Sequence, residues 1–254
     1  MTLIAQITDT HLLADPEAEM RGVKTWYSLK KVLAVVQNHQ PDLLLLTGDL
    51  AHEGEKEAYR HLKSLVDETK IPAYWLPGNH DDPNLMAQEL SSQFLHTNKV
   101  IHLNHWCIIL LNSYWQNATY GEGKLATTEL DWLETELIAN LDVPTAIAVH
   151  HHPVPTDIDW LDQISIVNAA ELHKIIREFP QVKTVFCGHI HHELNIIQNN
   201  IQFLGTPATC TQVTPAGYTL EEGKIQDWEQ PGFRLLELKN DGTLASTVHR
   251  IHWF

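Results

Sequence analysis

The chain contains few cysteines, and their arrangement argues against a disulfide framework. Only three occur in 254 residues, Cys107, Cys187 and Cys210, and no two of them have the C-x-x-C spacing. An odd number of widely separated cysteines is typical of proteins in reducing compartments. Cys107 and Cys187 lie within apolar runs, so we interpret them as small buried hydrophobic residues.

Basic residues are also scarce. Lysine and arginine number 17 against 32 aspartates and glutamates, which gives a formal net charge of −15. This charge repels nucleic acids and anionic membranes, so we expect neither a nucleic-acid polymer nor a membrane as a partner. A small anionic substrate is compatible with it, because bound metal ions reverse the field locally.

Long hydrophobic runs are absent as well. No apolar stretch approaches the roughly 20 residues that span a bilayer, and the N-terminus enters a strand pattern without a signal peptide. We therefore expect a cytoplasmic protein.

The chain is instead rich in histidine, with 17, and many of these follow short apolar runs. Buried strands that stop at Asp, His and Asn should build one crevice at one edge of a sheet, and oxygen and imidazole ligands suit divalent metal ions. Five runs have this form: Leu3–Ile7 before Asp9 and His11, Leu43–Leu46 before Asp49, Ala73–Leu76 before Asn79–Asp81, Ala146–Val149 before His150–His152, and Thr184–Cys187 before His189–His191.

The order of apolar patterns predicts a layered α/β fold. Strand and helix patterns alternate over the first 190 residues or so. Residues from about 194 to 254 form a mostly antiparallel part, with one hairpin around Asn199-Asn200 and another around Asn240–Gly242. No linker interrupts the chain, so we predict a single domain over residues 1–254. Helices are expected around Trp26–Val36, Glu55–Asp67, after Asp82-Pro83, from Thr127 or Thr128, and from Asn168.

The residues after the strands suggest individual roles. In an extended segment, Asp9 and His11 point the same way and can reach one ion. Gly48 permits a sharp turn, and the two oxygens of Asp49 could bridge two ions. Asn79 offers a neutral amide oxygen. His80 should face the opposite side, with Asp81 orienting it through a hydrogen bond.

Two histidine-rich segments complete the set. Of His150–His152, one residue is expected to be a ligand, and the residues alone leave the choice open. His189 and His191 are both candidates, whereas we place His192 outside the ligand set. His52 departs from the smaller residues expected near a substrate, and we expect it to influence the base or ribose pocket without touching the ligands.

Taken in order, the D-x-H, G-D, G-N-H-D, H-x-x-P and G-H-x-H motifs resemble those of the calcineurin-like metallophosphoesterases. Further motifs resemble the bacterial class III 3′,5′-cyclic AMP phosphodiesterases. They are Ile7–His11, Trp75–Asp81, Trp160–Asp162, Cys187–Glu193, Thr206–Gln212, Pro231–Arg234, Asp241–Thr243 and Val248–Arg250. The metal-ligand motifs are shared by the wider superfamily, so the cyclic AMP assignment depends on the motifs of the tail.

The resemblance implies the metallo-dependent phosphatase fold, a four-layer αββα sandwich of two mixed sheets flanked by helices. It also implies a metal-dependent phosphoric diester hydrolase that converts 3′,5′-cyclic AMP to AMP by in-line attack of a hydroxide held on two metal ions. Iron and manganese are favoured, and zinc also fits these ligands. The sequence gives no indication of the oligomeric state.

The resemblance further assigns residues. Asp9, His11 and His191 would hold one ion, Asn79, His150 and His189 the other, and Asp49 would bridge them. His150 matches the spacing to Pro153 and Pro155, whereas a shorter H-x-P reading selects His151. His80 would be the catalytic acid or phosphate contact. The substrate-binding set comprises His11, Asp49, Asn79, His80, His150 and His191.

Three alternatives compete with this interpretation. One is a broader phosphodiesterase or phosphatase of the same superfamily, acting on nucleotides, 2′,3′-cyclic nucleotides or glycerophosphodiesters. A second is a non-catalytic scaffold, although such proteins tend to lose ligands that are all present here. A histidine-rich metal store fits poorly, because the candidate ligands are dispersed and each follows a strand.

The loop from Trp115 to Lys124 is a further candidate for substrate specificity.

Overall fold

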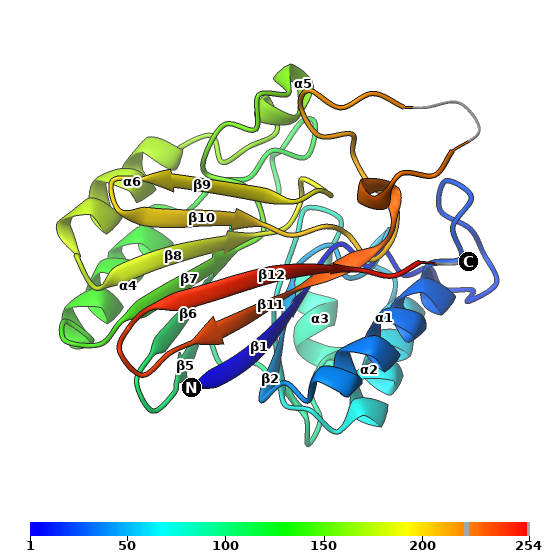
Figure 1. The fold of residues 1–254 in the computed structure, drawn as a ribbon, viewed down its shortest axis with the longest axis horizontal. Helices are drawn as coiled ribbons and strands as arrows, with labels where there is room; N and C mark the ends of the chain where they lie inside the picture. The colour runs from blue at the N-terminus through cyan, green and yellow to red at the C-terminus, as the bar shows by residue number, and fades with distance from the viewer. Residues whose placement is uncertain (221–223, 253–254) are drawn as a thin grey trace.

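The computed structural model describes residues 1–220 and 224–252, and these form two six-stranded sheets packed face to face (Figure 1). The predicted domain of 1–254 thus includes five residues that lie outside the described ones. The first sheet has the order β12 (Leu244–Arg250), β11 (Gly232–Leu238), β1 (Thr2–Ile7), β2 (Leu43–Thr47), β3 (Ala73–Leu76), β4 (Leu95–His96). The second has the order β5 (Val100–His102), β6 (Cys107–Leu111), β7 (Thr145–Val149), β8 (Val182–Cys187), β10 (Ile201–Gly205), β9 (Leu194–Gln198).

Both sheets are mixed. Strands β1 to β4 are parallel, and β11 and β12 add antiparallel strands beside β1. In the second sheet β6, β7, β8 and β10 are parallel, with antiparallel β5 and β9 at the edges. The antiparallel character expected after residue 194 is therefore present in two hairpins, one in each sheet.

Helices cover the outer face of each sheet. Apolar residues of α1 (Thr25–His39) and α2 (Lys56–Thr69) pack with the outer face of the first sheet, and those of α4 (Thr127–Ala139) and α6 (Ala169–Glu178) with the second. The predicted αββα sandwich is thus confirmed. The helices are α1 (Thr25–His39), α2 (Lys56–Thr69), α3 (Pro83–Glu89), α4 (Thr127–Ala139), α5 (Asp159–Asp162) and α6 (Ala169–Glu178), with a 3₁₀ turn at Asp227–Glu229. In the described part of the chain, none of the helices has the length and apolar character needed to cross a membrane.

Continuous apolar runs occur because central strands are covered on both faces. In β2, Leu44 and Leu46 pack toward the helices, whereas Leu43 and Leu45 pack in the core between the sheets. Strand β7 behaves likewise, with Ile147 outward and Ala148 between the sheets. Small and large apolar side chains therefore fill the layer between the sheets. Both faces of these strands stay buried, and the polar residues come only where the strands end.

Local signals set the element boundaries. Asp82 caps α3, since its Oδ1 accepts from the backbone N–H groups of Asn84 (2.9 Å) and Leu85 (3.1 Å), and Pro83 is the first helical residue. In the first hairpin, Asn199 and Asn200 both have positive φ (53° and 62°), as a two-residue turn between antiparallel strands requires.

Candidate metal centre

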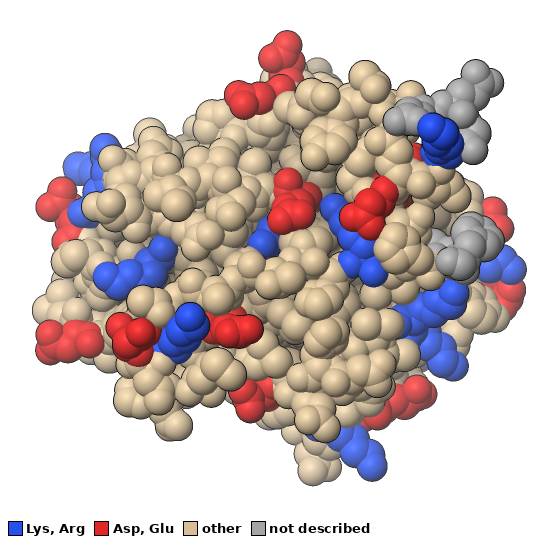
Figure 2. Space-filling model, viewed as in Figure 1, with Lys and Arg blue, Asp and Glu red and all other residues tan. Residues whose placement is uncertain are grey.

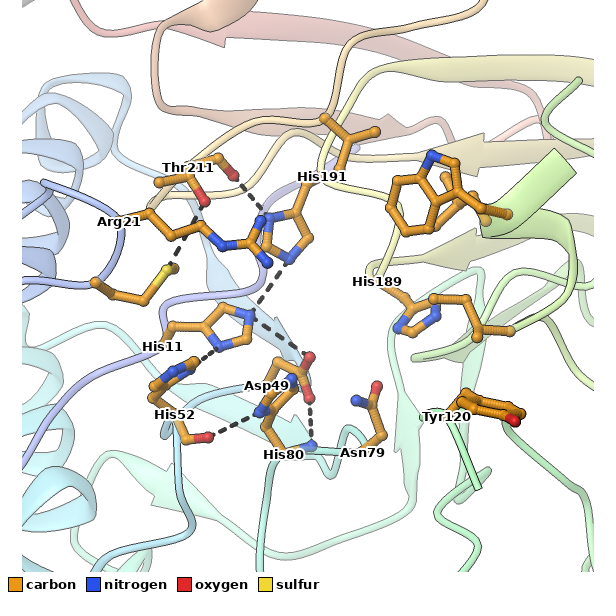
Figure 3. Close-up of a pocket in the computed structure, with 15 residues that line it drawn as sticks. His11, Arg21, Asp49, His52, Asn79, His80, Tyr120, His189, His191 and Thr211 are labelled. Atoms are coloured by element: carbon orange, nitrogen blue, oxygen red, sulfur yellow. Dashed lines mark hydrogen bonds and ion pairs between the residues drawn. The ribbon is translucent and has the colours of Figure 1, made fainter. Parts of the chain in front are cut away.

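The predicted ligand residues converge from both sheets. The loops after β1, β2 and β3 meet those after β7 and β8, and the His189 backbone N–H donates to Asp9 Oδ2 at 3.0 Å across the sheets. Figure 3 shows His11, Asp49 and Asn79 from the loops of the first sheet around the same pocket as His189 and His191 from the second. The expectation of a crevice at the edge of one sheet is therefore wrong. Non-local strand pairing, which the runs themselves do not encode, divides the five strands between two sheets.

The backbone at these residues is mostly left-handed. Such φ values are uncommon outside glycine and cost about 1–3 kcal/mol each. The loops are held by hydrogen bonds such as His11 N–H to Asp49 O (2.9 Å). The explanation that Asp9 and His11 share a face of an extended segment is wrong, because the chain coils at both. The positive φ values are 51° at Asp9, 42° at His11, 50° at Asp49, 67° at His189 and 52° at His191.

Two glycines permit close approach of the loops. A Cβ on Gly78 would lie 2.2 Å from Asp49 Oδ1, and one on Gly188 would lie 2.0 Å from Thr8 Oγ1. Neither distance is compatible with a side chain, so both loops depend on glycine.

One half of the centre joins Asp9, His11 and His191. His191 Nε2 lies 3.3 Å from Asp9 Oδ1 and 3.3 Å from His11 Nε2. Thr211 O accepts from His191 Nδ1 at 2.7 Å, which fixes the tautomer and leaves the Nε2 lone pair directed at the cluster. Burial opposes ionisation of Asp9, but the adjacent His191 outweighs it and lowers the pKa of the carboxyl.

The other half joins His150, Asn79 and His189. Thr47 O accepts from His150 Nδ1 at 2.8 Å, and His150 Nε2 lies 3.2 Å from Asn79 Oδ1. His189 is buried, and its Nε2 has no hydrogen-bond partner among the described residues. Asp49 stands between the halves, with Oδ2 3.3 Å from His150 Nε2 and 3.6 Å from His11 Nε2.

The histidine triple is asymmetric. The ring nitrogens of His151 contact Ser113 Oγ (2.7 Å) and Gly121 O (3.0 Å), whereas those of His150 contact Thr47 O and the candidate ligands Asn79 and Asp49. His152 is buried and its ring stacks near that of His189 (centroids 5.7 Å apart). Of the two alternatives that the sequence left open, His150 is the one with a ring nitrogen facing Asp49 and Asn79.

The charges and lone pairs fit divalent cations. Asp9, Asp49 and His150 place ligand atoms within 4.8 Å of one another, and two buried carboxylates this close repel unless cations accompany them. Burial lowers the pKa of His11 to about 3, which keeps it neutral, the form that binds metals. Burial opposes protonation of His150 too, but Asp49 outweighs it and raises the pKa to about 9. The site thus attracts positive charge.

Asp81 and His80 do not pair as predicted. His80 Nδ1 donates to His52 O at 2.8 Å. The Asp81 carboxylate instead accepts from the backbone N–H of Leu50 (3.1 Å), Ala51 (3.0 Å) and Gly78 (2.9 Å) and from the Tyr59 hydroxyl (3.0 Å). Asp81 therefore ties the loop that carries Asp49 to the loop that carries Asn79. The prediction was wrong because Asp81 is buried against the loop backbones, whereas His80 is exposed at the pocket.

His52 also differs from expectation. Its Nδ1 lies 3.1 Å from His11 Nδ1, so it does touch the ligand set. Its ring stacks on His80, with centroids 5.2 Å apart and an interplanar angle of 14°. The sequence marked His52 as unusual, but its partners depend on the fold of the loop.

Several residues that line the pocket were not singled out from the sequence as site residues. Arg21, Thr211 and Trp160 line it from three different segments, and Tyr120 comes from the loop proposed to influence specificity. Arg21 lies beside His191 in Figure 3, opposite Tyr120. An Arg-Gly pair between apolar residues is a weak turn signal and gave no indication of this position.

Comparisons with known proteins agree with this geometry. The sequence model of the calcineurin-like phosphoesterase family matches residues 2–193. The 3′,5′-cyclic adenosine monophosphate phosphodiesterase CpdA of Escherichia coli (strain K12) is 40% identical over 253 residues, covering 98% of this chain and 89% of that protein. The 3′,5′-cyclic-nucleotide phosphodiesterase alr5338 of Nostoc sp. (strain PCC 7120) is 39% identical over 250 residues, covering 98% and 92%.

Solved structures support the fold. A dimetal phosphatase from Danio rerio aligns with a TM-score of 0.68 at 11% identity, covering 92% of each chain. At this identity the likeness concerns the architecture only.

Proposed function

Because the chain belongs to the calcineurin-like phosphoesterase family, we propose that it is a metal-dependent phosphodiesterase that hydrolyses 3′,5′-cyclic AMP to AMP. The observation that carries the proposal is the near-complete alignment, at 40% identity, with a phosphodiesterase named for this substrate. The alignment covers 98% of the chain and so extends past residue 193, where the family match ends, into the region of the tail motifs.

The proposed ligands are the residues that converge at the centre. Asp9, His11 and His191 would hold one ion, and Asn79, His150 and His189 the other, with Asp49 between them. The lone pairs directed inward by the Thr211 and Thr47 carbonyls support this division. Bound ions would supply Lewis acidity toward the phosphate and make hydroxide available near neutral pH. Iron and manganese are the proposed metals.

His80 is the proposed catalytic residue. Its Nδ1–H donates to His52 O, which leaves Nε2 as the nitrogen available to the substrate. A protonated His80 could then donate from Nε2 to the leaving 3′-oxygen or to a phosphate oxygen. Its exposed position at the pocket supports this role, since a proton donor must reach the substrate. We propose that His11, Asp49, Asn79, His150 and His191 bind the phosphate together with the ions.

The proposal also covers the domain organisation, the cellular location and the class of substrate. A single domain is supported by the tail, because β9 and β10 extend one sheet and β11 and β12 the other. Free, buried cysteines support residence in a reducing cytoplasm. On the face in Figure 2, acidic and basic side chains are interspersed rather than gathered into one basic surface, which favours a small substrate over a nucleic-acid polymer.

A side-by-side assay tests the substrate. Purified protein is given 3′,5′-cyclic AMP, 2′,3′-cyclic AMP and bis(p-nitrophenyl) phosphate, and kcat/KM is compared. We expect a preference for 3′,5′-cyclic AMP. Equal rates on all three would support the broader phosphodiesterase instead. Metal analysis separates the enzyme from a metal store, since two ions per chain suit the enzyme and many more suit a metal store.

A further inference from the structure

We propose that Arg21 is a substrate-binding residue that holds the phosphodiester anion from the open side of the pocket. The inference rests on the proposed function and deepens it, because it names a specificity-determining contact that lies outside the metal-ligand motifs.

Arg21 occupies a tight turn with an unfavourable backbone conformation. The Met20 N–H donates to Val23 O (2.9 Å) and the Val23 N–H donates to Met20 O (3.0 Å). Between them Arg21 has φ 49° and Gly22 has φ 82°, the left-handed pair of a two-residue hairpin turn. Asparagine or glycine is favoured at the first of these positions, so an arginine there carries strain.

The turn is anchored to the segment that orients the metal centre. Met20 is only 6% exposed and packs against Ala208 and Cys210. Thr211, whose carbonyl accepts from His191, also directs its hydroxyl toward Met20 Sδ (3.9 Å). The backbone of Arg21 is therefore fixed relative to His191, and its side chain extends over the pocket beside that histidine (Figure 3).

The charge of Arg21 has no ion-pair partner in the part of the chain that the structure describes. Among the described residues that line the pocket, it is the only lysine or arginine. Its guanidinium makes no hydrogen bond or ion pair with any residue in the described ranges, whereas Lys24, three residues later, pairs with Glu17 at 2.8 Å. In a chain with a net charge of −15, a free guanidinium at the pocket gives an incoming anion a local attraction.

The geometry of the guanidinium group favours a phosphate group as its ligand. Its planar fork donates two parallel N–H bonds to a pair of oxygens, which matches the two non-bridging oxygens of a phosphodiester. A contact of this kind binds ground state and transition state alike, so its loss should raise KM and leave kcat nearly unchanged.

The test compares Arg21→Ala, Arg21→Lys and Lys24→Ala on cyclic AMP and on bis(p-nitrophenyl) phosphate, which carries the same anionic diester without a base. Loss of a charge-assisted pair predicts that Arg21→Ala raises KM about ten- to a hundredfold for both substrates. Arg21→Lys keeps the positive charge and should therefore show a smaller rise in KM than Arg21→Ala. Lys24→Ala, which removes a charge outside the pocket, should match the wild type. Metal content and Tm should be unchanged in all three variants.

Three results would overturn the proposal. One is an unchanged KM in Arg21→Ala. Another is a KM that rises for cyclic AMP alone, which indicates a contact with the base. The third is a loss of bound metal in Arg21→Ala. If the wild-type protein cleaves only the synthetic diester, the cyclic AMP proposal fails, while the Arg21 comparison is still decided on that substrate.

Discussion

Replacing Tyr59 with phenylalanine should destabilise the protein by about 2–4.5 kcal/mol, because the lost hydroxyl makes two hydrogen bonds in the interior. Tyr59 is fully buried; its hydroxyl donates to Asp81 Oδ1 (3.0 Å) and accepts from the Asp82 backbone N–H (2.8 Å). Burial and then Asp49 raise the pKa of Asp81 to about 6, so the carboxyl is ionised at pH 8.

The magnitude follows from the two bonds. A hydrogen bond to a charged group contributes about 1.5–3 kcal/mol, and a neutral one about 0.5–1.5 kcal/mol. In a chain of this size, each kcal/mol shifts Tm by roughly 2–4 °C, so the variant should melt roughly 4–18 °C below the wild type. Activity should fall as well, since Asp81 ties together the loops that carry Asp49 and Asn79.

Tyr27→Phe provides a matched control. The Tyr27 hydroxyl also donates to a carboxylate, that of Glu17, but the side chain is 42% exposed and water can replace the bond. Its cost should stay within about 0.5 kcal/mol. The assay is urea unfolding at pH 8 with metal-stripped protein. Equal losses in the two variants would refute the role given to Asp81. A double-mutant cycle with Asp81→Asn should in addition give a coupling of about 0.5–3 kcal/mol.

Other predictions concern the centre and its surroundings. His80→Ala should lower kcat by about 10²–10⁴-fold with metal content unchanged, and retention of full activity would exclude a catalytic role. Gly188→Ala places a Cβ 2.0 Å from Thr8 Oγ1, so both Tm and the metal bound after dialysis should fall; normal loading would show that the loop can shift. Burial lowers the pKa of His192 from 6.5 to about 4, so its neutral form stabilises the fold above pH 6.5 and this contribution is lost as pH falls toward 4. Metal-stripped His192→Asn should therefore lose less Tm across that window than the wild type, and parallel curves would contradict the assignment.

Much of the fold was predictable because it depends on local patterns. The Asp82-Pro83 cap, the Asn199-Asn200 hairpin and the five strand ends are set by neighbouring residues. The convergence of the candidate ligands was predictable for the same reason, since each lies within four residues of the end of an apolar run.

The errors and omissions are non-local. Which sheet a strand joins depends on pairings such as β1 with β11, far apart in the sequence. The roles of Asp81 and His52 depend on loops whose φ values the residue types disfavour. Arg21 reaches the pocket only because Met20 packs beneath residues near 210.

The position of β1 has a consequence for biosynthesis. Thr2 pairs with Leu238, so one hydrogen-bonding edge of β1 meets its partner only after a further 236 residues have been made. At roughly 5–20 residues per second, that edge waits on the order of 10–50 s on the ribosome. Exposed strand edges recruit other chains, so nascent protein should be most prone to aggregate before β11 emerges. Slowing translation of the segment before β11 should then lower the soluble yield more than slowing it after β11 has been made.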